Sequence, residues 1–393
     1  MKILSIETSC DETAISIVDA SGKTESPAFE VLGNALYSQI AIHKEFGGVF
    51  PMLAKREHVK NLPPILEKTL TEAKMFENGN PETSEVVWNE IEAILKKETG
   101  LFENFKNLLE NLAKPEIDVI CVTNGPGLEP ALWVGISFAL ALGKLWNIPV
   151  IPINHMEGHI FSILTQTDDN RPIQFPALAL LISGGHTELV LMESFGSYKL
   201  LGKTVDDAVG EAYDKTARML GLPYPGGPEI TKLAKYAREN LLEPVAKLPR
   251  PMIHSDNLNF SFSGLKTAVL YYLRDTFDGN AAKLTQENKA DIAREIDDAV
   301  TEVLTSKTRK ALEENDVKTL IIAGGVIANE RLRGIFQDFE KEYSGLIVKT
   351  PVKSMSTDNS VMIACAGYMK ISRDPGIVSY PQQIKAKGNM ELE

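Results

Sequence analysis

Two stretches of the chain carry the same pattern, and they constrain the fold more than any other feature. Residues 2–18 (KILSIETSCDETAISIV) and 177–192 (ALALLISGGHTELVLM) each consist of an apolar strand, a short polar turn and a second, alternating strand. This pattern is typical of a β-hairpin with one buried face. Its repetition predicts two related lobes, and such turns can direct backbone N–H groups toward an anionic ligand. The 393 residues, 44% of them hydrophobic, suffice for two cores.

Helical and strand patterns alternate along the rest of the chain. Alternation of this kind predicts an α/β fold with mixed sheets flanked by helices. We expect strands at 118–123, 150–153 and 319–323, and helices at 130–145, at 291–312 and from about 329.

The polar, proline-bearing run 167–176 predicts a boundary between lobes. We therefore expect an N-terminal lobe at 1–170 and a C-terminal lobe at 171–357. A terminal helix and tail at 358–393 would return toward the N-terminal lobe. Within that lobe, residues 75–114 have the pattern of an amphipathic helical pair. An insertion that packs on the lobe is favoured over a binding module, because charged helical faces are usually solvated.

Charge and cysteine content exclude several classes of protein. Cys10, Cys121 and Cys365 lie far apart, which argues against a disulfide framework or a cysteine-based zinc site and fits a reducing cytoplasm. Met1 leads directly into a strand pattern, so we expect no export signal. Polar residues and a proline interrupt the apolar stretch 131–153, which disfavours a membrane span. With a net charge of −12, RNA binding requires a local basic patch or a partner protein.

A histidine pair follows the strand at 150–153. If this segment is helical, His155 and His159 lie on one face at the spacing that lets two imidazoles reach one metal ion. Two histidines held by hydrogen bonds at a helix start are an equally good interpretation. The spacing also resembles the H-E-x-x-H signature of zinc proteases, but Met156 occupies the position of the general base and Glu157 points away from the shared face.

Paired glycines recur in the second half of the chain. They occur in the turn 183–187 and again at 225–228 and 323–325. Glycine lets the backbone approach an anionic ligand closely. A single such turn indicates only a hairpin, whereas three loops in one half suggest a nucleotide cradle.

Acidic residues complete the candidate set. Asp11 and Glu12 lie in the first hairpin turn, and Asp206, Asp207 and Asp214 lie around a helix start. Asp358 precedes an apolar helix. From spacing alone, helix capping is favoured for Asp358 over metal ligation.

These motifs together resemble the TsaD family of tRNA threonylcarbamoyladenosine synthesis proteins, members of the actin-like ATPase superfamily. The resemblance covers nearly the whole chain, although residues 75–114 look longer than the usual connection. It rests on IETSCDET (6–13), GGVFPMLAKREHVKNLPPIL (47–66), NGPGL (124–128), NHMEGH (154–159), SGGHTEL (183–189), DDAVGEAYDKTARMLGLPYPGGP (206–228), FSFSGLKTA (260–268), AGGVIAN (323–329) and STDNSVMIA (356–364).

The resemblance implies two duplicated actin-like, ribonuclease H-like lobes with a cleft between them. It implies an acyltransferase that moves the threonylcarbamoyl group of threonylcarbamoyl-AMP to N6 of adenosine 37 in tRNAs reading ANN codons. One divalent metal ion, Fe²⁺ or Zn²⁺, would bind His155, His159 and Asp358, which reverses the capping interpretation of Asp358. The implied substrate contacts are Ile182, Ser183, Gly184, Gly185, His186, Asp214, Gly227 and Asn329.

Asp11 and Glu12 are our hypothesis for proton handling near the adenine amine. In bacteria such proteins act with a paralogous TsaB-like partner and a small TsaE-like ATPase, and homodimerisation is the alternative. Two other functions stay open: a metalloprotease, and a nucleotide-switched binding protein of the actin-like superfamily. The chain departs from the family pattern at Met52, where a Glu is usual, and at Glu129-Pro130, where small residues are usual.

Overall fold

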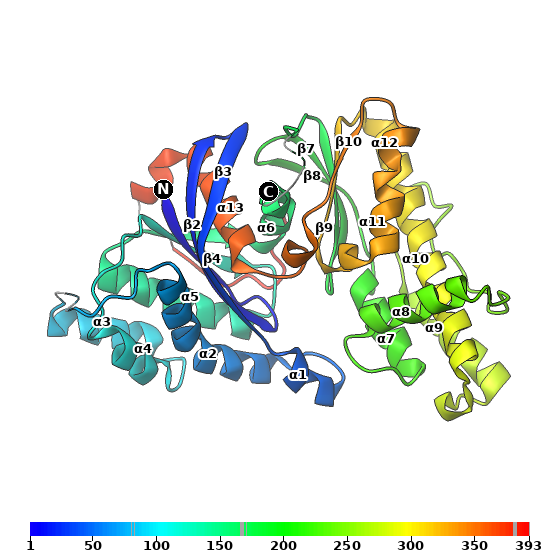
Figure 1. Ribbon diagram of the computed structural model, residues 1–393, viewed down its shortest axis with the longest axis horizontal. Coiled ribbons are helices and arrows are strands. Elements are labelled where there is room, and N and C mark those ends of the chain that lie inside the picture. Colours follow the sequence, from blue (N-terminus) through cyan, green and yellow to red (C-terminus); the bar gives the residue numbers. More distant parts are fainter. Residues whose placement is uncertain (80, 82, 166–168, 170, 380–382, 393) are drawn as a thin grey trace. The chain divides into compact units, whose positions relative to one another are not determined.

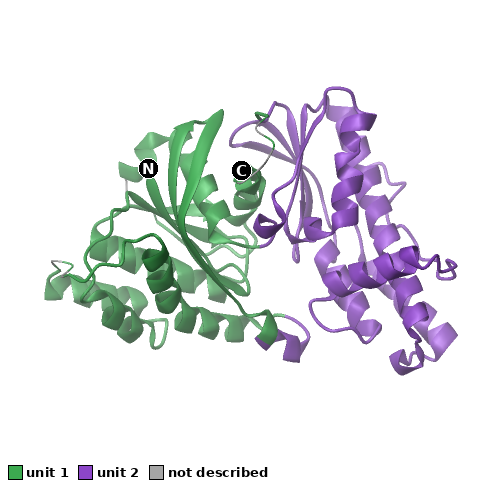
Figure 2. Ribbon diagram, in the orientation of Figure 1, with its two compact units in different colours: residues 1–41, 49–172, 358–392 green, residues 42–48, 173–357, 393 purple. Residues whose placement is uncertain are grey.

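The chain forms two compact units. The computed structural model describes residues 1–79, 81, 83–165, 169, 171–379 and 383–392. Unit 1 comprises residues 1–41, 49–172 and 358–392, and unit 2 comprises residues 42–48 and 173–357 (Figure 2). Within the predicted lobe boundary, residues 167, 168 and 170 lie outside the described residues.

Unit 1 is built on a five-stranded mixed sheet in the order β3-β2-β1-β4-β5 (Figure 1). The first hairpin pairs antiparallel, β3 continues it antiparallel, and β4 and β5 join in parallel. Its strands are β1 (Lys2–Glu7), β2 (Glu12–Lys23), β3 (Ser26–Ser38), β4 (Val119–Gly125) and β5 (Val150–Asn154).

Unit 2 repeats this sheet. Its order, β10-β9-β6-β7-β8, is the same topology read from the other edge, with β6 and β7 antiparallel and β6 and β9 parallel. Both predicted hairpins are therefore confirmed, as is the α/β class with two duplicated lobes. The strands are β6 (Ala177–Ile182), β7 (Thr187–Ser194), β8 (Ser197–Lys203), β9 (Thr319–Ala323) and β10 (Ile347–Lys349).

The helices begin and end where capping residues allow. α5 starts with a proline in its first turn and ends at Asn147 in the left-handed conformation. α10 starts earlier than the predicted residue 291, because Thr285 and Asn288 form a capping box. The helices are α1 (Ile40–His43), α2 (Pro51–Glu72), α3 (Glu85–Leu95), α4 (Leu101–Leu109), α5 (Glu129–Trp146), α6 (His155–Phe161), α7 (Val209–Met219), α8 (Gly226–Glu239), α9 (Ser263–Phe277), α10 (Gln286–Asn315), α11 (Glu330–Gln337), α12 (Phe339–Glu342) and α13 (Ser360–Arg373).

In unit 1, helices cover both faces of the sheet. Alternate residues of β4 point to opposite faces. Ile120 and Val122 join the core formed with α2 and α5. Cys121 faces α13, where a Cβ on Gly367 would lie only 2.3 Å from the Cys121 sulfur. Gly367 therefore lets α13, which follows Asp358, approach the sheet closely.

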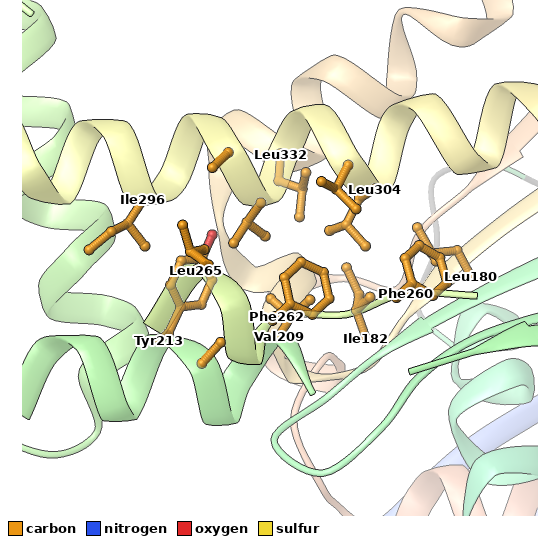
Figure 3. Packing of buried hydrophobic residues seen from close by; sticks show 14 of the residues in the cluster. Leu180, Ile182, Val209, Tyr213, Phe260, Phe262, Leu265, Ile296, Leu304 and Leu332 are labelled. Atoms are coloured by element: carbon orange, nitrogen blue, oxygen red, sulfur yellow. The ribbon is translucent and has the colours of Figure 1, made fainter. Parts of the chain in front are cut away.

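Unit 2 has a separate core between its sheet and α10. Figure 3 shows Leu180, Ile182, Phe260, Phe262 and Leu304 packed together there, and all five side chains are buried. Each unit therefore buries its own apolar residues and forms a core of its own.

The predicted helical pair is confirmed, as α3 and α4. Ile91 and Phe105 are completely buried, and Phe105 makes edge-to-face contacts with Trp88 and with Phe138 of α5. This segment therefore contributes to the core of unit 1.

One of the three predicted glycine loops is wrong. Gly226 and Gly227 form the first turn of α8, which begins after Pro225. Gly226 fits there because a Cβ would lie 2.5 Å from the Ala217 side chain of α7. The glycine thus serves close packing of α7 on α8.

Candidate functional site

The segment that carries the histidine pair is helical, which is the condition for both imidazoles to share one face. The Asn154 side chain caps α6 by accepting hydrogen bonds from the backbone N–H groups of Met156, at 2.8 Å, and Glu157, at 3.4 Å. The imidazole rings of His155 and His159 lie 4.7 Å apart at 82°. Both side chains are buried, so their ring nitrogens depend on partners within the protein.

Asp358 lies beside both imidazoles. Its Oδ1 is 3.5 Å from His155 Nε2 and 3.2 Å from His159 Nε2. The three potential ligand atoms all lie within 4.8 Å of one another, and the three residues belong to unit 1. The cap of α13 is Asn359, whose side chain accepts from Met362 N at 3.0 Å. The capping interpretation of Asp358 is therefore wrong, because its neighbour takes that role.

The three residues fit a divalent cation. His159 is fully buried, yet neither of its ring nitrogens has a hydrogen-bond partner of suitable geometry among the described residues. Buried polar atoms without partners are rare in proteins, and a bound cation would give these nitrogens a partner. Two imidazole nitrogens and one carboxylate form a donor set that suits Zn²⁺ or Fe²⁺ and leaves coordination positions open.

Electrostatics keep Asp358 ionised. Burial alone would raise the pKa of Asp358, but the two imidazoles hold that pKa well below its usual value. Burial would likewise lower the pKa of His155, but Glu7 and Asp358 raise that pKa well above its usual value. The two carboxylates therefore favour the protonated form of His155, and binding of a metal ion would require the loss of that proton.

Glu157 does not join this group. Its Oε1 accepts a hydrogen bond from Arg373 Nη2 of α13 at 3.0 Å. The carboxylate is thus engaged in an ion pair away from the ligand set, as the helical spacing predicted.

The first hairpin turn holds its acids next to this group in unit 1. Asp11 accepts at its backbone oxygen from Gln39 N at 2.9 Å, and Ser38 Oγ donates to Glu12 Oε1 at 3.2 Å. Burial raises the pKa of Glu12 well above its usual value, and the charges of Asp11 and Asp358 raise it further. Glu12 is therefore a carboxyl group that can hold a proton closer to neutral pH.

In unit 2, the β6–β7 turn is held by backbone hydrogen bonds to the start of α7, and the space beside its two glycines is free. Ser183 O accepts from Gly210 N at 3.2 Å, and Gly184 O accepts from Glu211 N at 3.1 Å. Apart from each glycine and its two chain neighbours, no atom of the described residues lies within 4 Å of where a Cβ would stand on Gly184 or Gly185. The start of α7 thus fixes the turn, while the glycines leave its backbone accessible.

The other predicted contacts of unit 2 have structural partners. Asp214 Oδ1 accepts from Gly226 N at 2.6 Å, which ties α7 to the start of α8. Asn329 Nδ2 donates to Asp297 Oδ1 at 2.9 Å, and Asn329 Oδ1 caps α11 by accepting from Arg331 N at 3.0 Å.

Asp206 and Asp207 are also engaged in hydrogen bonds. Asp206 accepts from Ser261 Oγ at 2.5 Å and from Phe262 N at 2.8 Å. Asp207 pairs with Lys215 at 2.7 Å. The Asp206 contacts join the segment before α7 to the segment before α9, and the Asp207 pair ties that segment to α7 itself.

Sequence analysis missed Glu7 and Asp297, two fully buried acids beside the candidate residues. A signal existed for each. Glu7 ends a strand in which residues 3–6 are apolar or small, and Asp297 falls between Ile296 and Val300 on the apolar face of α10.

Comparison with known proteins identifies the family. The family model described as TsaD, tRNA N6-adenosine threonylcarbamoyltransferase, matches residues 30–78 and 101–365. A protein of that name from Ralstonia pickettii is 41% identical over 96% of this chain and 94% of its own length. One from Persephonella marina is 41% identical over 100% of this chain and 96% of its own. The chain belongs to this family.

Among solved structures, full-length HypF in its phosphate- and nucleotide-bound form is similar, with a TM-score of 0.48 and 12% identity over 94% of this chain and 55% of that one. The matches to the TsaD family are matches to transferases, and they favour neither the metalloprotease nor the nucleotide-switched binding protein. No helix among the residues that the structure describes is both long and apolar enough to cross a membrane.

The departures from the TsaD pattern lie outside the candidate residues. Met52 is half-exposed in the first turn of α2. Glu129 Oε1 accepts from Gly388 N at 3.3 Å, and Gly127 N donates to Gly388 O at 3.1 Å. Glu129 therefore helps to hold the C-terminal segment on the 124–128 loop. Residues 79–100, which include α3, fall between the two segments that the family model matches.

Proposed function

We propose that this protein transfers the threonylcarbamoyl group of threonylcarbamoyl-AMP to N6 of adenosine 37 in tRNAs that read ANN codons. The observation that carries the proposal is the match to TsaD-family transferases at 41% identity over the whole chain. An acyl transfer to an aromatic amine needs a polarised carbonyl and close positioning, because such an amine is a weak nucleophile.

In this proposal His155, His159 and Asp358 hold one divalent cation, Fe²⁺ or Zn²⁺. Their ligand atoms lie within 4.8 Å of one another, and the buried His159 nitrogens lack hydrogen-bond partners among the described residues. When bound, such a cation supplies Lewis acidity to phosphate or carbamoyl oxygens.

The turn of unit 2 would hold the adenylate. The proposed contacts are Ile182, Ser183, Gly184, Gly185 and His186, with Asp214, Gly227 and Asn329. Support comes from Gly184 and Gly185, whose backbone is open on the side that a Cβ would occupy. Because the Asn329 side chain already joins α10 to α11, its role would be to shape the site through these two helices.

Asp11 and Glu12 would handle the proton that N6 loses when its new bond to the carbamoyl carbon forms a urea and the bond from that carbon to AMP breaks. A general base works best when its pKa lies near the working pH. The raised pKa of Glu12 supports this assignment, and Asp11, its buried neighbour, contributes negative charge.

We propose that partner proteins share the binding of tRNA with this chain. A net charge of −12 is unfavourable for tRNA binding by this chain alone, which supports sharing the tRNA with a TsaB-like partner and a TsaE-like ATPase. The cytoplasm is the proposed location, because tRNA is modified there.

Mass spectrometry of tRNA nucleosides tests the function. Cells depleted of this protein should lose threonylcarbamoyladenosine, and the wild-type gene should restore it. His159→Ala should fail to restore it, whereas His254→Ala, a control at an exposed histidine outside the site, should restore it fully. Unchanged levels of the modified nucleoside after depletion would disprove the proposed activity.

A further inference from the structure

Glu7 is a fully buried carboxylate at the end of β1, and its partners come from three separate segments. Ser9 N donates to Oε1 at 2.5 Å, and Thr123 Oγ1 of β4 donates to Oε2 at 2.6 Å. The same Oε2 lies 2.9 Å from His155 Nδ1. A buried charge is costly unless it is hydrogen-bonded, so this set of donors stabilises an ionised Glu7 at this position.

The two nitrogens of His155 therefore have different partners. An ionised carboxylate only accepts hydrogen bonds, so the nitrogen facing Glu7 must carry the hydrogen. Nδ1 faces Glu7, and Nε2 faces Asp358 at 3.5 Å. In the neutral imidazole, the lone pair is then on Nε2, on the side of the proposed cation.

We propose that Glu7 is a positioning residue that fixes the tautomer and ring orientation of His155, so that Nε2 is presented to the metal ion. The inference rests on the proposed metal centre and extends it. Carboxylates that accept from the second nitrogen of a metal-bound histidine orient the ring and increase its basicity.

The contrast with His159 supports this assignment. His159 Nδ1 has no hydrogen-bond partner among the described residues, whereas His155 Nδ1 has Glu7 and also lies 3.3 Å from Ser9 Oγ. Of the two imidazoles on α6, only His155 is thus held by an acidic side chain at its far nitrogen within this part of the structure. Glu7 therefore supports one particular ligand.

Metal binding to Glu7→Gln measures this role directly. Glutamine keeps the size of the side chain and removes its charge. The affinity of the full-length protein for Zn²⁺, measured by competition with a chromophoric chelator, should fall about 10- to 100-fold. The visible absorption of the Co²⁺-loaded protein should weaken and shift. Thr123→Val, which removes one donor to Glu7 and leaves its charge, should lower the affinity by a smaller factor.

Glu157→Gln is the matched control. It removes a buried carboxylate from α6, the helix that carries both histidines, and that carboxylate accepts from Arg373 of α13. Its Zn²⁺ affinity should equal that of the wild type. An unchanged affinity in folded Glu7→Gln, or an equal loss in Glu157→Gln, would overturn the inference.

If Glu7→Gln does not fold, Thr123→Val decides, and wild-type affinity in that variant overturns the inference. A wild type that binds no cation but restores modified tRNA would refute the metal centre and this inference with it, while leaving the transfer activity standing. A wild type that binds Zn²⁺ without restoring modified tRNA would refute the activity alone.

Discussion

Asp297 lies on the apolar face of α10 and is fully buried, yet its carboxylate has four donors. Oδ1 accepts from Tyr213 at 3.2 Å and from Asn329 at 2.9 Å, and Oδ2 accepts from Arg238 at 2.8 Å and from Arg331 at 3.0 Å. Asp297 thus joins α7, α8 and α11 to α10, and it contacts Asn329, one of the proposed nucleotide contacts.

Replacing Asp297 by Ala should lower the free energy of unfolding by about 3 kcal/mol, because the two guanidinium groups lose their more buried shared acceptor. Both guanidinium groups keep Asp298 Oδ1 as a second acceptor. This value is at the lower end for buried pairs, since both arginines are partly exposed. Urea denaturation measures the loss. Glu239→Ala, which breaks an exposed pair with Lys235, should change stability by less than about 1 kcal/mol. Equal effects in the two variants would contradict this account of Asp297.

Removing the Glu12 carboxyl group should raise stability at neutral pH, whereas removing that of Asp297 should lower it. Its pKa is raised in the folded protein, so the folded state binds the proton more tightly than the unfolded chain does. Its contribution is therefore most favourable below the unfolded pKa and declines as pH rises through the folded pKa. At pH 7, Glu12→Gln should be more stable than the wild type in the presence of EDTA, and the difference should vanish near about pH 4. Thermal unfolding across pH checks this, and a less stable variant at pH 7 would exclude the raised pKa.

At the scale of elements, we expect the segment 79–100 to contribute to the stability of unit 1 and not to the rate of tRNA modification. Ile91 of α3 is completely buried against the core of unit 1, although this segment lies outside the family match. Ile91→Ala should cost about 2–5 kcal/mol through lost burial and the cavity left behind. Val86→Ala, on the exposed face of the same helix, should change stability by at most about 0.5 kcal/mol.

Both variants should keep the wild-type rate of tRNA modification at a temperature where they are folded. Denaturant titration gives the first quantity and a transfer assay gives the second. A selective loss of rate in stable Val86→Ala would instead indicate that the exposed face of α3 has a binding role.

Element types were predictable where periodicity was long and its ends were capped. The helix at 291–312 and the hairpins at 2–18 and 177–192 follow directly from apolar spacing, and all appear in the structure. The start of α10 was missed by several residues, because Thr285 lies outside the apolar pattern and acts through Asn288. The start of α10 is therefore set by side-chain capping, which the spacing of apolar residues does not predict.

The candidate site was predictable only in part. His155 and His159 are neighbours on one helix, so their spacing alone predicted a shared face. For Asp358 the local pattern favoured capping, since Asn359 beside it offers the same chemistry, and only the family resemblance indicated ligation. Glu7 meets its partners across 116 and 148 positions of sequence, a proximity that requires the parallel pairing of β1 with β4.

At the scale of the whole molecule, the two units share one sheet topology but have different side chains at the turn of the first hairpin. The turn after β1 presents Asp11 and Glu12, whereas the corresponding turn after β6 presents Gly184 and Gly185. The three proposed metal ligands belong to unit 1, and the proposed nucleotide contacts belong to unit 2. The two copies of one sheet topology thus carry different residues at equivalent turns, acids in unit 1 and glycines in unit 2.

Because the proposed metal ligands belong to unit 1 and the proposed nucleotide contacts to unit 2, each ligand should stabilise a different unit. Each unit has its own apolar core, so each should unfold in its own calorimetric transition. A ligand that binds only the folded state stabilises the unit that holds it, by about 2.7 kcal/mol at a concentration 100 times its Kd. Zn²⁺ should therefore raise the unfolding temperature of unit 1 and leave that of unit 2 in place. His159→Ala should abolish the shift, because it removes a ligand without touching unit 2. A shift confined to the transition of unit 2, or one that persists in His159→Ala, would show that the cation binds elsewhere.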